Sequence, residues 1–292
     1  MEWQEVLIRL LKNKISLVGL IIVVVLGLIA IFAPWIAPPS DPSDPYNIPR
    51  GGWGVEPQPP NEEHPFGTTE GQYDIFYGII WGTRTAFRIG FIVVGISTLI
   101  GIIVGTVSAY YGGWVDEIIM RITDIFMAIP YLIAAIVLTT ILGQGLNNVM
   151  IALVAFGWMS TARLMRSQVL EMKAEEFVDA AHALGAGDLR VIMKHILLNS
   201  IFPVLIQASM RMGSMVITAS SLSFLGVGAP EGYADWGQMI SFSRNWLLGT
   251  EGNPLNFWYT IIYPGLAISI FCLSWNLIGD AFRDILDPKL QT

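Results

Sequence analysis

Long runs of apolar residues without a charge are the feature that most restricts this chain. The first run, residues 15–33, has nineteen residues, follows basic residues and ends at Pro34. A helix of about twenty residues is long enough to cross the hydrocarbon core of a bilayer. Residues 89–115 are also free of charge. A cleaved signal peptide is the alternative for the first run, but its apolar part would usually be about 7–15 residues. The runs therefore predict membrane-spanning helices.

Composition supports an integral membrane protein and excludes several kinds of chemistry. Hydrophobic residues make up 53% and charged residues 13% of the chain, whereas a soluble domain has about 25% charged residues. A single cysteine, Cys272, rules out an internal disulfide, and His64, His182 and His195 are scattered. Neither a metal site nor a redox centre is expected. The net charge is -7 and no basic patch occurs, so no nucleic-acid partner is expected.

Turn residues and charges divide the chain into a short segment, 1–14, and one transmembrane domain, 15–292. The predicted spans are about 15–34, 87–112, 118–142, 149–168, 200–226 and 257–280. Two aqueous loops, 38–84 and 229–256, separate the first and last pairs, and a polar segment, 170–195, joins spans four and five. Gly112 and Gly113 predict the end of span two, and Pro130 predicts a kink in span three. Gly101 and Gly105 predict close helix packing, which we expect within the chain rather than in a dimer.

The basic residues predict the orientation. Six spans put both termini on one side of the membrane. Eleven of the sixteen Lys and Arg lie on that side, four lie on the other, and Arg211 lies within a span. The positive-inside rule therefore predicts a multi-pass protein of the cell membrane, with both termini and segment 170–195 in the cytoplasm. The two outer loops hold ten acids, so the external face is expected to be negative.

The chain carries no sign of its own energy source. None of its five lysines is followed by Ser or Thr, so the phosphate loop of nucleotidases is missing. Any ATP hydrolysis must belong to another chain. An autonomous secondary transporter is an alternative, but such proteins usually place carboxylates inside their spans. A receptor or scaffold is a more distant alternative.

Span five has a polar face. Its members are Gln207, Arg211, Ser214, Thr218 and Ser221, at intervals of four, three, four and three, which puts them on one side of a helix. A polar face is costly in lipid, so it should meet water or protein. Two interpretations stay open: these side chains line a solute pathway, or they pack against a neighbouring helix.

Segment 170–195 is typical of two short helices joined by a turn. The first helix would carry an apolar stripe of Phe177, Val178, Ala181 and Leu184. Gly185 and Gly187 allow the backbone to turn, and Asp188 can cap a second helix that continues into span five. Taken alone, the segment is most simply interpreted as a solvated loop helix.

In its context the segment resembles the cytoplasmic loop of ABC importer permeases. That pattern is Glu-Ala-Ala, three residues, Gly, nine residues, then Ile-x-Leu-Pro. Asp179-Ala180-Ala181, Gly185 and, after nine residues, His195-Ile196-Leu197-Leu198 occupy those places. Asp179 replaces Glu, and Leu198 replaces Pro. Without that Pro, the second helix should run into span five with a gentler bend.

Further stretches resemble one branch, the dipeptide, oligopeptide and nickel permeases, and within it the C-type subunit. They are HPFGT at 64–68, residues 177–195, LSFLGVG at 222–228, WG at 236–237, NLIGD at 276–280, RD at 283–284 and DP at 287–288. After Thr68 the family usually has Asp and then Gly-Arg-Asp, where this chain has Thr69 and Gln72-Tyr73-Asp74. Peptides are the expected substrate, with oligosaccharides or another small solute as the alternative.

The resemblance implies an all-α, six-span transmembrane domain of a type I ABC importer with a cytoplasmic coupling helix. It also implies a homologous second permease, two cytoplasmic ATPase subunits that hold ATP and magnesium, and an extracytoplasmic binding protein, all assembled in membrane lipid. The chain itself would be no enzyme and would bind no cofactor. The resemblance assigns ATPase coupling to Asp179, Ala180, Ala181, Leu184 and Gly185. Its outer motifs suggest binding-protein docking at His64, Gly67, Asp74 and Trp236.

Overall fold

The computed structural model describes residues 14–246, 253 and 255–286, and helices dominate this part of the chain. Nearly all of the predicted segment 1–14 and part of the predicted loop 229–256 lie outside the described residues. Five described helices are long and apolar enough to cross a membrane: Ser16–Ile36, Ile75–Tyr111, Leu146–Lys173, Asp188–Phe224 and Tyr259–Asp284. A sixth crossing results if the bent pair Gly113–Met127 and Tyr131–Leu142 counts as one span. Counted in this way, the six spans agree with the prediction of an all-α, six-span fold, and span three is broken into two helices.

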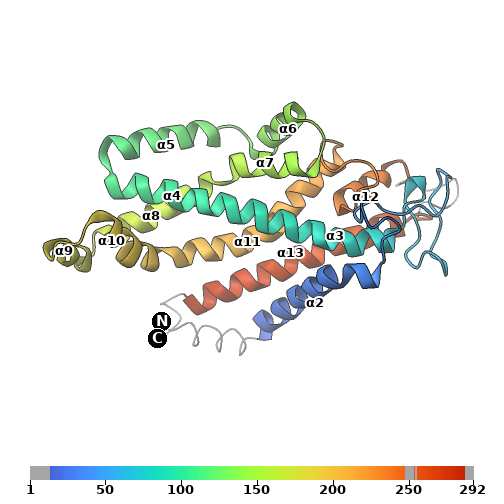
Figure 1. Cartoon of the computed structure of the whole chain (residues 1–292), viewed down its shortest axis with the longest axis horizontal. Coiled ribbons are helices and arrows are strands. Elements are labelled where there is room, and N and C mark those ends of the chain that lie inside the picture. Colours follow the sequence, from blue (N-terminus) through green and yellow to red (C-terminus); the bar gives the residue numbers. More distant parts are fainter. Residues whose placement is uncertain (1–13, 247–252, 254, 287–292) are drawn as a thin grey trace.

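The helices run lengthwise through an elongated bundle (Figure 1). In chain order they are α2 (Lys14–Ile36), η1 (Glu70–Gln72), α3 (Ile75–Ile89), η2 (Gly90–Val94), α4 (Gly95–Tyr111), α5 (Gly113–Met127), α6 (Tyr131–Leu142), α7 (Leu146–Gly157), α8 (Met159–Lys173), α9 (Glu176–Ala183), α10 (Asp188–Val191), η3 (Ile192–Ile196), α11 (Leu197–Phe224), α12 (Trp236–Phe242), η4 (Arg244–Trp246) and α13 (Tyr259–Leu286). Helices α9 and α10 lie at one end, which we call the α9 end. Residues 37–74 and 225–246, with α12, lie at the other, which we call the cap end.

The first loop is shorter than predicted. Helix α3 begins at Ile75, so the last ten residues of the predicted loop 38–84 are helical. Arg84, in this part of α3, lies over the Trp81 ring, 5.1 Å from its centroid, and Arg88 donates to the Asn147 side-chain oxygen at 2.9 Å. Both charges are therefore accommodated by the helix itself or by its neighbour α7.

Close packing joins α4 to α8. A Cβ atom on Gly101 would lie 2.6 Å from the Thr161 Cβ, and one on Gly105 would lie 2.3 Å from the Ala162 carbonyl oxygen. Such distances are well inside van der Waals contact, so only glycine allows this approach. The predicted small-residue pair is thus an internal packing contact.

Breaks in the helices occur where the sequence predicts them. Gly112 and Gly113 have φ of 64° and 52° and end α4. Pro130 precedes α6, and the axes of α5 and α6 differ by 83°. A proline cannot continue a hydrogen-bonded helix, so the kink expected there is a sharp break. Leu198, by contrast, lies inside one continuous helical run from Asp188 to Phe224. The helix is thus not interrupted at Leu198, and the gentler bend itself stays a prediction.

Candidate translocation and coupling sites

The polar face of α11 is only partly exposed. The Ser214 hydroxyl donates to the Arg211 carbonyl at 3.1 Å, Thr218 to the Ser214 carbonyl at 2.8 Å, and Ser221 to the Ile217 carbonyl at 2.8 Å. These bonds lie within the helix and satisfy the hydroxyl donors without a neighbouring element. Ser214 is exposed, and Thr218 and Ser221 are half-buried. These three residues can therefore line a polar but uncharged surface.

The other two members of the predicted face contact α7 and α8. The Thr161 hydroxyl donates to the Gln207 Oε1 at 3.2 Å and accepts from the Arg211 Nη1 at 2.9 Å. The Arg211 Nη2 donates to the Gly157 carbonyl at 2.6 Å. Gln207 and Arg211 therefore make the packing contacts of one interpretation. Ser214, Thr218 and Ser221 remain candidates for the solute pathway of the other. Thr161 and Gly157 are participants that the sequence did not single out.

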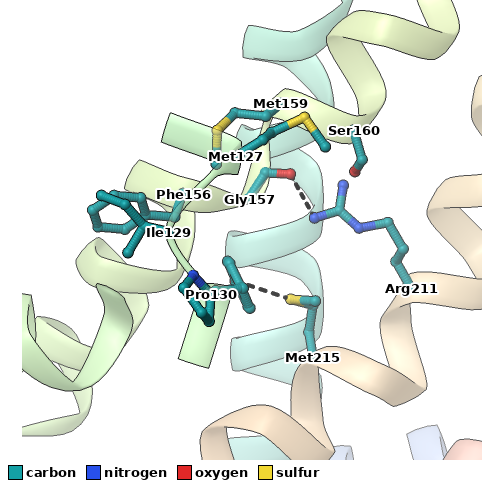
Figure 2. Close-up of a pocket in the computed structure, with 10 residues that line it drawn as sticks. Met127, Ile129, Pro130, Phe156, Gly157, Met159, Ser160, Arg211 and Met215 are labelled. Carbon is teal, nitrogen blue, oxygen red and sulfur yellow. Dashed lines mark hydrogen bonds between the residues drawn. The ribbon is translucent and has the colours of Figure 1, made fainter. Parts of the chain in front are cut away.

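Hollows flank α11 at two levels. One, of about 310 Å³, lies between α11, α8 and the break that joins α5 to α6, and Arg211 is part of its wall (Figure 2). The other, of about 280 Å³, is lined by Ser221, Ser220, Phe224 and Gly237 with apolar neighbours. Arg211 and Ser221 therefore border separate spaces.

Helix α9 exposes most of the residues assigned to coupling. Asp179, Ala180 and Gly185 are exposed, and Leu184 is 89% exposed. Gly185 has φ of 82°, and no atom lies within 4 Å of the position of an added Cβ. Ala181 differs because it is buried in this conformation. It therefore supports the helix from beneath and cannot touch a partner directly.

The predicted apolar stripe of α9 is divided. Val178 and Ala181 are buried in the cluster that includes Met165 and Val191, whereas Phe177 is exposed like Leu184. Burial of two small or medium side chains holds one face of an eight-residue helix. The opposite face presents a large aliphatic side chain to the surroundings.

Tyr110, at the end of α4, connects the two helices of this end. Its hydroxyl lies 3.2 Å from the His182 Nε2 and donates to the Asp188 Oδ1 at 2.9 Å, while the Lys173 Nζ donates to the Tyr110 carbonyl at 2.6 Å. The prediction that Asp188 caps α10 is wrong: Gly187 is the N-cap residue, and Asp188 is the first helical residue with its carboxylate on Tyr110. The role of Tyr110 could not be predicted from the sequence, because its partners lie 72 and 78 residues away.

Three of the four residues suggested for docking are buried at the cap end. Trp236 is 2% exposed, its Nε1 donates to the Ile79 carbonyl at 3.3 Å, and a Cβ on Gly82 would lie 2.5 Å from that nitrogen. Gly67 is buried with φ of 76°, and a Cβ there would lie 2.6 Å from the Gln58 carbonyl oxygen. These residues are unavailable for direct contact, which corrects the prediction for them.

Asp74 and His64 form the remaining pair of that set. The Asp74 Oδ1 accepts from the Tyr77 N–H at 2.8 Å and so caps α3, and its Oδ2 lies 2.6 Å from the His64 Nδ1. Asp74 is buried, and His64 is half-buried. Their geometry fits a structural tie between the loop and α3, so the docking assignment for Asp74 is also corrected.

A second acid has the same capping role in the cap. The Asp235 side chain accepts from the Gln238 N–H at 2.9 Å at the start of α12. Complete burial raises the pKa of Asp235, although N–H donors of α12 oppose that rise. Asp74 and Asp235 thus both cap helix N-termini at this end.

Comparisons with known proteins agree with this architecture. Residues 97–292 match the family described as binding-protein-dependent transport system inner membrane component. Residues 2–60 match the N-terminal transmembrane domain of oligopeptide transport permease C. Together the two matches cover most of the chain.

Curated relatives cover almost the whole length. The dipeptide transport system permease protein DppC of Alkalihalophilus pseudofirmus is 38% identical over 99% of this chain and 91% of its own length. The oligopeptide transport system permease protein OppC of Bacillus subtilis is 36% identical over 99% and 90%. The glutathione transport system permease protein GsiD of Pectobacterium atrosepticum is 34% identical over 99% and 92%.

A solved structure supports the same fold. An inward-facing conformation of the MetNI methionine ABC transporter superposes with a TM-score of 0.58 at 17% identity, covering 73% of this chain and 98% of that one. The chain therefore belongs to the inner-membrane permeases of binding-protein-dependent transport, in their dipeptide and oligopeptide permease-C branch, and has the fold of a type I ABC importer transmembrane domain.

Proposed function

We propose that this chain forms half of the membrane pathway of an ATP-driven importer for peptides. Its partners would be a second permease, two cytoplasmic ATPases that bind ATP and magnesium, and an extracytoplasmic binding protein. The peptide substrate is supported by full-length relatives named as dipeptide and oligopeptide permeases. The absence of a phosphate loop from the sequence supports separate ATPase subunits.

The observation that carries the mechanism is the form of the α9 end. Leu184 and Gly185 form an exposed knob at the end of α9, and α9 is joined through short turns to two long helices, α8 and α10–α11. A partner that moves this knob would displace both helices as rigid rods. ATP-driven closure of the ATPases would in this way reorient the polar face of α11. Asp179 and Ala180 would lie at the rim of that contact.

The α9 end would then face the cytoplasm, together with both termini. The start of α2 and the end of α13 point toward that end of the bundle, which is consistent with this orientation (Figure 1). The cap end would face the binding protein. Because the buried residues of the cap cannot make that contact, the docking surface would consist of exposed cap residues around His64.

A bulky residue at Gly185 tests the coupling role. Gly185→Trp adds volume into open space. A side chain at φ of 82° strains this exposed turn, but the turn contributes little to the fold, so the protein should insert in the membrane at the normal level. Uptake of peptide into vesicles that contain all subunits should be abolished, together with substrate-stimulated ATPase activity. Gly185→Asn is the matched control, since Asn tolerates positive φ and is small. Normal uptake by a well-inserted Gly185→Trp protein would remove the assignment. ATP-independent uptake by the purified chain alone would remove the importer mechanism.

A further inference from the structure

Arg211 is a cation near the middle of a membrane-spanning helix. It lies about halfway along α11 and is half-buried. Placing a guanidinium at this depth costs several kcal/mol unless an anion or many hydrogen bonds compensate it, and such residues usually mark a binding or transport site. The groups that contact the Arg211 guanidinium therefore indicate whether it can bind an anionic ligand.

Among the residues that the structure describes, only neutral oxygens accept hydrogen bonds from the Arg211 guanidinium. Its acceptors are the Gly157 carbonyl and the Thr161 hydroxyl. Within the described part of the chain, none of the ion pairs includes Arg211. Two arginines of α8 provide a contrast, because Arg163 pairs with Asp124 and Arg166 pairs with Asp116. A guanidinium has five N–H donors, so Arg211 retains both its charge and donors for a further acceptor.

The remaining donors lie beside the cavity of about 310 Å³. Figure 2 shows the guanidinium at its edge, with the Ser160 side chain pointing toward it. A Cβ on Gly157 would lie 3.2 Å from the Arg211 Nη2, so the glycine leaves the room that this position needs. The end of α7 at Gly157 also leaves its carbonyl available as an acceptor. The cation is thus held in place from one side and open on the other.

The rest of the cavity is apolar and adaptable. Its wall includes Met127, Met159, Met215, Phe156 and Tyr131. Methionine side chains adjust to different apolar shapes. The volume is at the small end of ligand pockets, which span about 300–1,000 Å³. The space is therefore suited to one end of a larger molecule: an anionic group beside Arg211 and an apolar group among the methionines.

We infer that this cavity binds the C-terminal carboxylate and the last apolar side chain of a peptide as it passes through the membrane. The inference rests on the proposed function and adds a chemical preference to it. A carboxylate accepts two parallel N–H bonds from a guanidinium, which gives both strength and orientation. The neutral acceptors on Gly157 and Thr161 hold Arg211 without neutralising it, so the charge is compensated only when the peptide arrives.

Cysteine protection in the complete transporter tests this site. Ser160→Cys, in a Cys272→Ser background, places a thiol at the cavity, and its alkylation by a water-soluble reagent is followed in vesicles. The probes are dileucine and dileucine amide, which lacks the carboxylate. Dileucine should slow the alkylation at a concentration about tenfold lower than its amide, as expected for loss of a charge-assisted pair. Equal protection by both probes, or protection by neither, overturns the inference.

Variants separate binding from a purely structural role. Arg211→Gln should abolish the preference for the free acid, and Arg211→Lys, which keeps the charge, should retain part of it. Arg163→Gln is the matched control, because its cation is already paired with Asp124. A preference that survives Arg211→Gln overturns the inference. If the Arg211→Gln variant fails to accumulate, the comparison of dileucine with its amide in the protein that keeps Arg211 is the deciding test. ATP-driven uptake without a carboxylate preference defeats only this inference, whereas lack of ATP-driven peptide uptake defeats the proposed function.

Discussion

Trp236 at the cap end is 2% exposed, whereas Leu184 at the α9 end is 89% exposed. Bonds in the cap join distant parts of the chain: the Tyr73 hydroxyl donates to the Glu231 Oε1 at 3.0 Å, across 158 residues. At the α9 end, α9 buries only Val178 and Ala181. The cap is thus stabilised by contacts between distant segments. At the α9 end, a helix with few buried contacts connects the long helices α8 and α11. Such a difference fits the proposed function, in which a partner moves the α9 end.

The largest loss of stability should follow from removing a buried side chain that connects distant segments of the cap. Trp236→Ala deletes a buried indole that packs on Gly82 and bonds to the Ile79 carbonyl, and a large-to-small change of this kind costs about 3–5 kcal/mol. The melting temperature of the detergent-solubilised transporter should fall strongly. Trp114→Ala, at a site 74% exposed, is the matched control and should leave it nearly unchanged. A small shift of the melting temperature for Trp236→Ala would mean that the cap unfolds independently of the helix bundle.

The next largest loss of stability should come from removing Asp74, which connects the first loop to α3. Asp74→Ala removes a helix cap worth about 1–2 kcal/mol and leaves His64 without its carboxylate partner. Thermal stability should fall measurably, and Asp74→Asn should restore most of it, because the amide oxygen can still accept from Tyr77. If Asp74→Asn is as harmful as Asp74→Ala, the contact with His64, rather than the cap, holds this loop.

Features with local determinants could be predicted from the sequence. The apolar runs, Gly112 and Pro130 mark spans and breaks because hydrophobicity and backbone freedom act within a few residues. Burial and side-chain contacts that depend on a residue far away in the chain could not be predicted. Trp236 belongs to a motif that suggested docking, but its burial depends on α3, 157 residues away in the bond to Ile79. Arg211 was singled out as a charge in a span, yet Gly157 and Thr161, 54 and 50 residues away, define its site.

A smaller effect is expected at the α9 end itself. Tyr110→Phe removes the hydroxyl shared by His182 and Asp188, and a hydrogen bond of this kind contributes about 1 kcal/mol. The melting temperature should hardly change, but amide hydrogen exchange in residues 176–191 should accelerate because the tie to α4 is lost. Tyr111→Phe, whose ring is 57% exposed, is the matched control. Unchanged exchange in Tyr110→Phe would show that apolar packing of Val178 alone fixes α9.

Leu184→Ala should have the smallest effect on stability, about 0.5 kcal/mol or less, because the side chain contributes little to the fold when it is this exposed. Its effect on transport should be large if the exposed knob is the surface that an ATPase grips. Peptide-stimulated ATPase activity of the complete transporter should fall while its melting temperature stays constant. Leu189→Ala, 74% exposed on α10, provides a matched aliphatic control outside the proposed contact. Equal losses of activity in both variants would extend the contact to α10, and full activity in Leu184→Ala would show that exposure at this end serves no coupling. The contrast between the two ends would then be one of stability alone, since the lightly held helix would have no driven role.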